Sequence, residues 1–252
     1  MLTCAERTIT PVAADALLFS NSRPPGAQVP FAHAAAPLRD HLGDRTVWFA
    51  GWAGHDLDAY TGFVADALSA VLGPLDVRGL HREPDPAATI RAADPDRETV
   101  FVGGGNTFRL RRRVGDNGVL AALRERTDLR YAGASAGSNL ACPTIMTTND
   151  MPIVDPGGLD ALARIPVQIN PHYLDPDPHS THRGETREER IAEFHEENAV
   201  TVVGLREGAW LFRSGERLTL DGYTARLFRR GHEPAELTAG TDLSWLLATP
   251  GS

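Results

Sequence analysis

The pentapeptide Gly133-Ala134-Ser135-Ala136-Gly137 has the Gly-x-Ser-x-Gly pattern of a nucleophilic serine. In this pattern a strand turns sharply into a helix, and the two glycines let the chain pass without clashes while the serine hydroxyl stays exposed. The N-terminus of the following helix favours negative charge that develops beside the serine. The pattern predicts Ser135 as a nucleophile, although alone it also fits a small polar residue at the start of a helix.

A nucleophilic serine needs a general base, and the base needs a carboxylate to orient it. Among the nine histidines, His172 follows the segment "PVQINP" and is expected to emerge from the end of a strand, so we predict it as the base. For the acid we favour Asp150, which ends "TIMTTND". Asp155, Asp175 and Asp177 are alternatives, but aspartates in proline-rich loops are more often turn residues.

The oxyanion of an acyl-transfer reaction needs backbone N–H donors close to the nucleophile. The N–H of Ala136, directly after Ser135, is one predicted donor. The second is expected from Gly104 or Gly105, which belong to the run "GGGN" at the end of another predicted strand. Asn106, the last residue of this run, is expected to contact the substrate.

The segment "HYLDPDPHSTH" also contains residue types that bind metals. The chain lacks a His-Glu-x-x-His helix, and a loop broken by prolines would hold ligands loosely. We therefore expect neither a metal nor another cofactor. The residues concerned are His172, Asp175, Asp177, His179 and His182.

Apolar runs that are typical of strands alternate with helical patterns through the first half of the chain. Such βαβ units indicate an α/β fold with a parallel sheet covered on both faces, and ligands bind beyond the carboxyl ends of its strands. Both Ser135 and the glycine run lie at such ends. The expected strands are 16–22, 45–54, 75–81, 99–106 and 130–135, and the expected helices are 57–71, 86–93 and 107–126, the last with a break near Gly115.

The second half of the chain begins with a proline-rich segment, 150–186, and loops of this length in a compact domain are usually functional. A helix should then begin after Thr186, with Glu189 at capping-box spacing. A buried strand at 199–205 and antiparallel strands at 209–220 and 223–231 should follow, with turns at Ser214-Gly215 and Asp221-Gly222. We expect one domain, 1–252, with an N-terminal extension over about residues 1–13.

Composition and charge exclude several classes of partner. The formal net charge is −8, which argues against nucleic acid. No apolar run is long enough to span a membrane, and the first residues lack the pattern of a signal peptide. The two cysteines are too few for a disulfide framework and fit a reducing compartment, so we expect a cytoplasmic protein.

Five segments together resemble the aspartyl dipeptidases of serine peptidase family S51, in the same order and at matching spacing. They lie between about Leu17 and Trp210 and are "FVGGGNTF", "SAGSNLACPTI", "TTNDMPIVDP", "QINPH" and "GETREERI". The resemblance implies a three-layer α/β sandwich with a mostly parallel central sheet, of the class I glutamine amidotransferase-like (flavodoxin-like) kind. It also implies hydrolysis of dipeptides with an N-terminal aspartate (Asp-Xaa) by a serine peptidase that requires no cofactor.

The family's Ser-His-Asp triad falls on Ser135, His172 and Asp150. The arginine of its Gly-Glu-Thr-Arg motif, implicated in holding the aspartate side chain, falls on Arg187, and a guanidinium can bind a carboxylate bidentately. The chain departs from the family at Ala134, where a bulky tryptophan is expected, and over residues 173–184. Both departures affect the expected range of substrates more than the chemistry.

Three rival interpretations remain open. A cyanophycinase-like β-aspartyl peptidase would use similar serine chemistry. A glutamine amidotransferase domain would need a cysteine at the position of Ser135. A non-catalytic binding module of the same fold would be expected to lose one of the three triad residues. The sequence leaves open whether the protein is a monomer or a homodimer.

Overall fold

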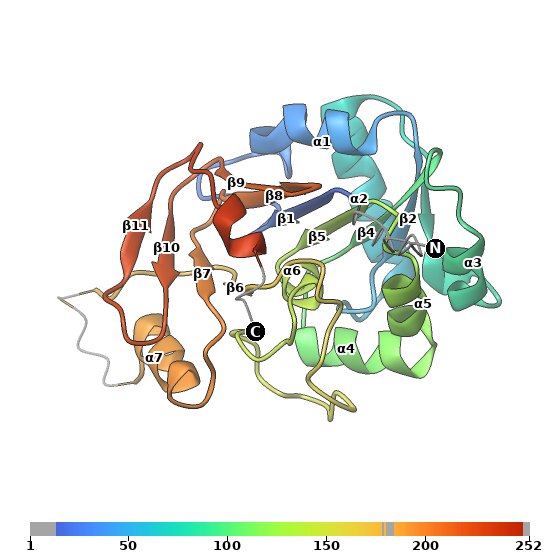
Figure 1. Ribbon diagram of the computed structural model, residues 1–252. Coiled ribbons are helices and arrows are strands. Elements are labelled where there is room, and N and C mark those ends of the chain that lie inside the picture. The colour runs from blue at the N-terminus through green and yellow to red at the C-terminus, as the bar shows by residue number, and fades with distance from the viewer. Residues whose placement is uncertain (1–13, 178, 180–183, 249–252) are drawn as a thin grey trace, which may run out of the picture.

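A central sheet of seven strands forms the middle of the molecule (Figure 1). The computed structural model describes residues 14–177, 179 and 184–248, so the expected N-terminal extension lies outside the described residues. Five strands are parallel to one another, as the alternating pattern predicts; the sixth is antiparallel to them, and the seventh is antiparallel to the sixth. In spatial order the strands are β3 (Val77–Gly79), β2 (Thr46–Ala50), β4 (Glu98–Val102), β5 (Tyr131–Ala134), β1 (Ala16–Phe19), β8 (Trp210–Ser214) and β9 (Arg217–Asp221).

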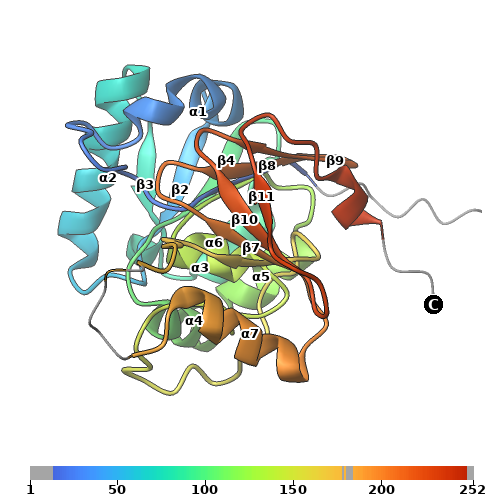
Figure 2. The same cartoon turned by 90° about the vertical axis from the view of Figure 1, so that its left-hand side faces the viewer.

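Helices cover both faces of this sheet, which confirms the three-layer α/β prediction (Figure 2). Alternate residues of one strand point to opposite faces. In β1, Leu17 and Phe19 pack with α1 (Ala35–Leu42) and α2 (Leu57–Leu72), whereas Ala16 and Leu18 face the other helical layer. That layer contains α3 (Pro86–Ala92), α4 (Thr107–Asp116), α5 (Val119–Glu125) and α6 (Ala136–Ala141), and short 3-10 helices lie at Ala32–Ala34, Leu80–Arg82 and Ser244–Leu247.

A second sheet, which was not predicted from the sequence, lies beside the first. Its order is β11 (Ala235–Leu237), β10 (Ala225–Phe228), β7 (Val202–Leu205) and β6 (Gln168–Asn170), with α7 (Arg187–Glu197) packed on it. The predicted hairpin over 209–220 is confirmed as β8 and β9. The turn at Asp221-Gly222 forms no hairpin, because β10 pairs with β7 and β11 in the second sheet.

Two local predictions about helices are confirmed. The helix expected over 107–126 is interrupted: α4 ends at Asp116, and α5 begins at Val119 after Gly118, whose φ is 75°. At the start of α7, the Thr186 side chain accepts from the Glu189 N–H and the Glu189 carboxylate accepts from the Thr186 N–H, which is a complete capping box.

The buried histidine of α1 should make stability depend on pH. Burial, the largest cause, and the charges of Arg130 and Arg45 lower the pKa of His41 to about 4, against smaller opposing effects of Asp15 and a backbone hydrogen bond. His41 is therefore neutral in the folded chain, while its unfolded pKa stays near 6.5. The stability that neutral His41 contributes is fully present above pH 6.5 and is lost as the pH falls towards 4. The total loss in the free energy of unfolding is about 3 kcal/mol.

Denaturant unfolding at pH 7 and pH 4 measures this effect. Between pH 7 and pH 4, the free energy of unfolding of His41→Leu should fall by about 3 kcal/mol less than that of wild type. His55→Leu, at an exposed histidine, is the matched control and should follow wild type. The same pH dependence in all three proteins would contradict the assignment.

Candidate active site

The turn from β5 into α6 has the strained geometry that the Gly-x-Ser-x-Gly pattern predicts. Ser135 has φ 53° and ψ −109°, a conformation that non-glycine residues rarely adopt. A Cβ on Gly133 would lie 2.6 Å from the carbonyl oxygen of Gly137, and a Cβ on Gly137 would collide with the carbonyl of Val102. Both glycines are therefore required for the chain to turn here, and the turn leaves Ser135 partly exposed.

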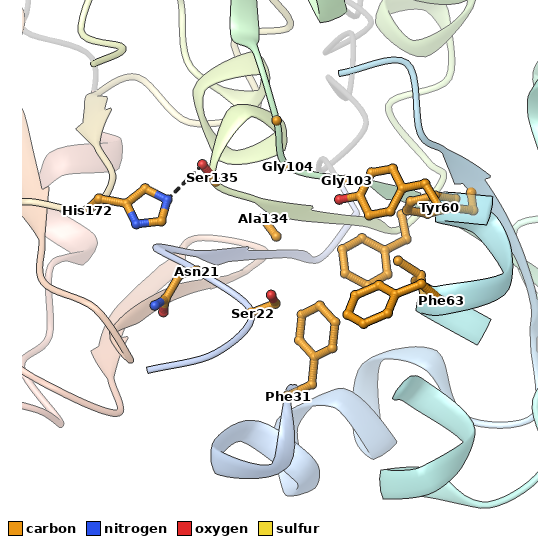
Figure 3. A pocket seen from close by; sticks show the side chains of 14 residues that line it. Asn21, Ser22, Phe31, Tyr60, Phe63, Gly103, Gly104, Ala134, Ser135 and His172 are labelled. Carbon is orange, nitrogen blue, oxygen red and sulfur yellow. Dashed lines mark hydrogen bonds between the residues drawn. The ribbon is translucent and has the colours of Figure 1, made fainter. Parts of the chain in front are cut away.

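The structure brings His172 against Ser135. The His172 Nε2 lies 3.0 Å from the Ser135 Oγ (Figure 3). His172 also has a positive φ, 53°, and its N–H donates to the Ser20 Oγ at 2.9 Å. Because Ser20 itself donates to the Leu205 carbonyl and the Ser135 N–H donates to Phe19, the end of β1 holds both residues. Positive φ at two non-glycine residues in contact is the kind of strain that clusters at functional sites.

Glu207, and not Asp150, is the carboxylate on His172. The His172 Nδ1 lies 2.9 Å from the Glu207 Oε1. The reason is strand pairing: β6 and β7 are parallel neighbours, and His172 and Glu207 each follow the carboxyl end of one of them. In a parallel pair, those ends meet at one edge of the sheet. The site therefore joins Ser135 from the central sheet to His172 and Glu207 from the second sheet.

Asp150 lies instead at the start of α4, so its predicted contact with His172 is wrong. Its Oδ2 accepts from the Thr107 N–H at 2.7 Å, the Thr107 hydroxyl at 2.6 Å and the Thr148 hydroxyl at 3.1 Å. A carboxylate is favoured there because the first N–H groups of a helix are unpaired and carry partial positive charge. The rival aspartates also lie elsewhere: Asp155 and Asp177 accept from loop N–H groups, and Asp175 pairs with Arg206.

The loop after β4 lies beside the nucleophile, as expected. A Cβ on Gly104 would lie only 3.2 Å from the Ser135 Cβ. Burial raises the pKa of the Tyr60 hydroxyl, against a smaller opposing effect of the nearby Gly104 backbone. The N–H groups of Ala136, Gly104 and Gly105 have no acceptor within the described part of the chain.

Asn106 is the N-cap of α4. Its Oδ1 accepts from the Arg109 N–H at 3.0 Å, and its Nδ2 donates to the Met151 carbonyl at 2.8 Å. Both polar atoms of the side chain therefore serve to connect α4 to the 149–151 loop.

A cavity of about 310 Å³ opens beside Ser135 towards α1 and α2. Its lining combines the Ser135–His172 pair, the glycine loop and a group of aromatic side chains (Figure 3). Ligand sites typically have this size and a mostly apolar lining with a few polar groups. The aromatic residues of the lining are Phe31, Phe49, Tyr60, Phe63 and Phe101.

Arg187, the first residue of α7, is half-buried. Burial, the largest cause, and the positive charge of Arg190 lower its pKa, and the negative charge of Asp150 raises it. Within the described residues its guanidinium has neither an ion pair nor a hydrogen bond. A partly desolvated arginine that has no partner among the described residues is suited to bind an anion.

The histidine-rich segment does not form a metal site in the described part of the chain. Those residues contain no group of three or more His, Cys, Asp or Glu side chains placed to hold a metal, and His182 lies outside them. Nor does any described helix have the length and apolarity to cross a membrane.

Glu207 and Ser20 were not predicted from the sequence. Each directly follows, or nearly follows, a buried strand: Ser20 comes after β1, and Glu207 comes two residues after β7. The rule that selected Ser135 and His172, a polar residue past a strand end, could have selected both. What was lacking was the knowledge that β6 pairs with β7.

Comparison with known proteins places the chain in a family. The model of Peptidase family S51 matches residues 16–220. This chain belongs to peptidase family S51. Peptidase E of Streptomyces coelicolor is 53% identical over 206 residues, which are 81% of this chain and 82% of that protein. Peptidase E of Salmonella typhimurium is 45% identical (89% and 97% covered), and the probable alpha-aspartyl dipeptidase of Drosophila melanogaster is 42% identical (93% and 98%).

Solved structures agree on the fold. A putative peptidase E protein from Listeria monocytogenes is similar with a TM-score of 0.60 at 21% identity, over 83% of this chain and 98% of that one. A peptidase from an acI-B1 actinobacterium is similar with a TM-score of 0.63 at 13% identity, over 92% and 96%. Together with the parallel central sheet, these likenesses confirm the predicted flavodoxin-like, class I amidotransferase-like architecture.

Proposed function

We propose that this protein is a serine dipeptidase that hydrolyses Asp-Xaa dipeptides. In this proposal Ser135 is the nucleophile, His172 the general base and Glu207 the acid that orients it. The observation that carries the proposal is the 3.0 Å contact of the His172 Nε2 with a strained, partly exposed Ser135 hydroxyl. The names of the family relatives, peptidase E and probable alpha-aspartyl dipeptidase, support the same substrate class.

The first half of the reaction follows from these contacts. The Glu207 carboxylate accepts from the Nδ1–H of His172, so that Nε2 is free to take the proton of Ser135. The Oγ then attacks the scissile carbonyl. The N–H groups of Ala136 and of Gly104 or Gly105 stabilise the oxyanion.

His172 then gives its proton to the leaving amine, and the aspartyl group stays on Ser135 as an ester. Water takes the place of the amine, gives its proton to His172 and attacks this ester. The proton returns to the Ser135 oxygen as aspartate leaves. Each step uses side chains and backbone N–H groups of this chain and needs no cofactor.

The proposed partners are therefore small peptides, with the cytoplasm as the site of action and no role for nucleic acid or membranes. The net charge of −8 agrees with the exclusion of nucleic acid. We assign no oligomeric state between monomer and homodimer.

Cys142, the cysteine within the described residues, does not offer an alternative nucleophile for amidotransferase-like chemistry. Cys142 is fully buried, and burial raises the pKa of its thiol to about 12. Nucleophilic cysteines are partly exposed and have lowered pKa values. Cys142 is instead a packing residue of the core beside α6.

Hydrolysis of a matched set of dipeptides tests the proposal: Asp-Leu, isoAsp-Leu, Glu-Leu and Ala-Leu. We expect kcat/KM for Asp-Leu to exceed the other three by roughly 100-fold, the effect of a buried polar or charged contact that the others cannot make. Faster hydrolysis of isoAsp-Leu would favour the cyanophycinase-like alternative. No hydrolysis of any of the four would contradict the peptidase assignment.

Arg187 should carry the preference for aspartate. Arg187→Gln is expected to lower kcat/KM for Asp-Leu roughly 100-fold, because a desolvated carboxylate loses its charged partner. The kcat/KM for Ala-Leu should stay nearly unchanged. Arg190→Gln is the control on the same helix, since Arg190 pairs with Glu185 at 3.4 Å. Equal losses on both substrates in Arg187→Gln would indicate a structural role.

A further inference from the structure

The cavity beside Ser135 has rigid aromatic walls. The ring centroids of Phe31 and Phe101 lie 5.5 Å apart, and those of Phe49 and Tyr60 lie 5.1 Å apart, both edge-to-face. Phe49 also contacts Phe101 at 6.0 Å. Edge-to-face contacts of this kind hold rings in fixed orientations, so the cavity exists before a ligand enters.

The lining of this cavity combines an exposed ring with a very small residue. Phe63 is 47% exposed although it is a large apolar side chain. Opposite the phenylalanines, Ala134 at the end of β5 contributes only a methyl group to the wall (Figure 3). A larger side chain at position 134 would extend into the cavity directly beside Ser135.

The cavity is unsuited to a carboxylate side chain. Of the described residues that line it, His172 is the single one that can carry a positive charge, and it faces Ser135 and Glu207. A carboxylate buried among these rings would lack a partner, which is costly. The half-buried Arg187 does not belong to this lining and feels the charge of Asp150 at the start of α4. The aspartyl side chain and this cavity are therefore on different sides of the reacting bond.

A dipeptide has one other side chain, that of the leaving residue. We propose that the aromatic cavity receives this side chain, that the preferred second residue is large and apolar or aromatic, and that Ala134 and Phe63 determine this preference. The proposal rests on the proposed function and specifies its substrate class as Asp-Phe-like and Asp-Leu-like dipeptides. Charged second residues are disfavoured, because the aromatic lining offers no charged partner to replace water.

The size of the preference follows from apolar burial. Each methylene bound in an apolar pocket changes kcat/KM by about 10-fold or more. We expect kcat/KM for Asp-Phe and Asp-Leu to exceed that for Asp-Ala by roughly 10- to 100-fold. The kcat/KM for Asp-Lys should equal that for Asp-Ala or fall below it. Cleavage of Asp-Ala, even when slow, measures the proposed function separately from the preference.

Two variants and a control test the assignment to this cavity. Ala134→Leu should lower kcat/KM for Asp-Phe at least 10-fold, since the added side chain occupies the space of the phenyl ring. The kcat/KM for Asp-Ala should change much less. Phe63→Ala, at an exposed position that tolerates truncation, should lower kcat/KM for Asp-Phe about threefold to tenfold. The kcat/KM for Asp-Ala should again change little. Trp245→Ala, at a ring that is 51% exposed and outside the cavity lining, should leave the Asp-Phe to Asp-Ala ratio as in wild type.

Product inhibition gives a readout that does not depend on turnover of the tested side chain. With Asp-Ala as substrate, free phenylalanine should inhibit wild type at least 10-fold more strongly than free alanine, and Ala134→Leu should abolish this difference. Equal kcat/KM values for Asp-Phe, Asp-Ala and Asp-Lys would overturn the inference while leaving the dipeptidase proposal intact. A preference for Asp-Phe that both variants leave unchanged would overturn the assignment to this cavity.

Discussion

Replacing Ser135 with alanine is expected to lower kcat for Asp-Leu by roughly a millionfold, the scale at which a serine peptidase loses its covalent route. The reason is that the Ser135 Oγ is the one group that both contacts His172 and projects from the strained turn at the carboxyl end of β5. Without it no acyl-enzyme forms. Steady-state hydrolysis of Asp-Leu with purified protein, at concentrations high enough to detect slow turnover, measures the loss.

The double variant Ser135→Ala/His172→Ala is the matched test of the shared mechanism. Because His172 acts through Ser135, removing it from a chain that already lacks the hydroxyl should cost almost nothing more. Ser138→Ala is unsuitable as a control, since the Ser138 hydroxyl donates within the core to Phe19. Undiminished hydrolysis of Asp-Leu by Ser135→Ala would refute the mechanism.

The first half of the fold could be predicted because its signals are local. Buried parallel strands are continuous apolar runs, and the turn at Ser135 requires glycines at two fixed positions, so both can be recognised without knowing the strand order. The capping box at Thr186 and Glu189 is likewise contained in four residues. For the same reason, Ser135 and His172 could be selected from the sequence as a pair.

The strand-end rule admits Glu207 as well as Asp150 but could not decide between them, because the position of the orienting carboxylate depends on strand pairing across long separations. Glu207 is 35 residues from His172 and meets it through the parallel contact of β6 with β7. Asp150 has the same chemistry and also lies in a loop close to the site, so the sequence offered no reason to reject it. Only the unpaired N–H groups at the start of α4 explain why that carboxylate is directed elsewhere.

This arrangement also explains why the site spans two sheets. The end of β1 reaches both parts: Phe19 accepts from the Ser135 N–H, and the Ser20 hydroxyl lies between the His172 N–H and the Leu205 carbonyl. The central sheet therefore sets the position of the nucleophile, and β1 fixes the second sheet against it. Small displacements of His172 relative to Ser135 are thereby resisted by backbone contacts on both sides.

Glu207→Gln is expected to lower kcat about ten-thousand-fold for both Asp-Leu and Ala-Leu. An amide in place of the carboxylate can turn its NH₂ group towards the Nδ1 of His172, which then holds its proton on Nε2 and cannot accept one from Ser135. Glu207→Asp, which keeps the charge, should recover part of the activity. Because the loss concerns proton transfer, it should be the same for both substrates and leave their ratio unchanged.

Asp150→Asn separates the two carboxylates. Asp150 is hydrogen-bonded to the start of α4, and its negative charge acts on Arg187. Its replacement by Asn therefore removes a charge that opposes the aspartyl carboxylate of the substrate, and should raise the preference for Asp-Leu over Ala-Leu while kcat for Ala-Leu changes little. Comparing the ratio of kcat/KM for the two substrates in wild type, Glu207→Gln and Asp150→Asn distinguishes an orienting acid from a residue that acts through the substrate-binding arginine. A large, substrate-independent loss in Asp150→Asn beside an active Glu207→Gln would return the orienting role to Asp150, since only the carboxylate on the Nδ1 of His172 governs every substrate alike.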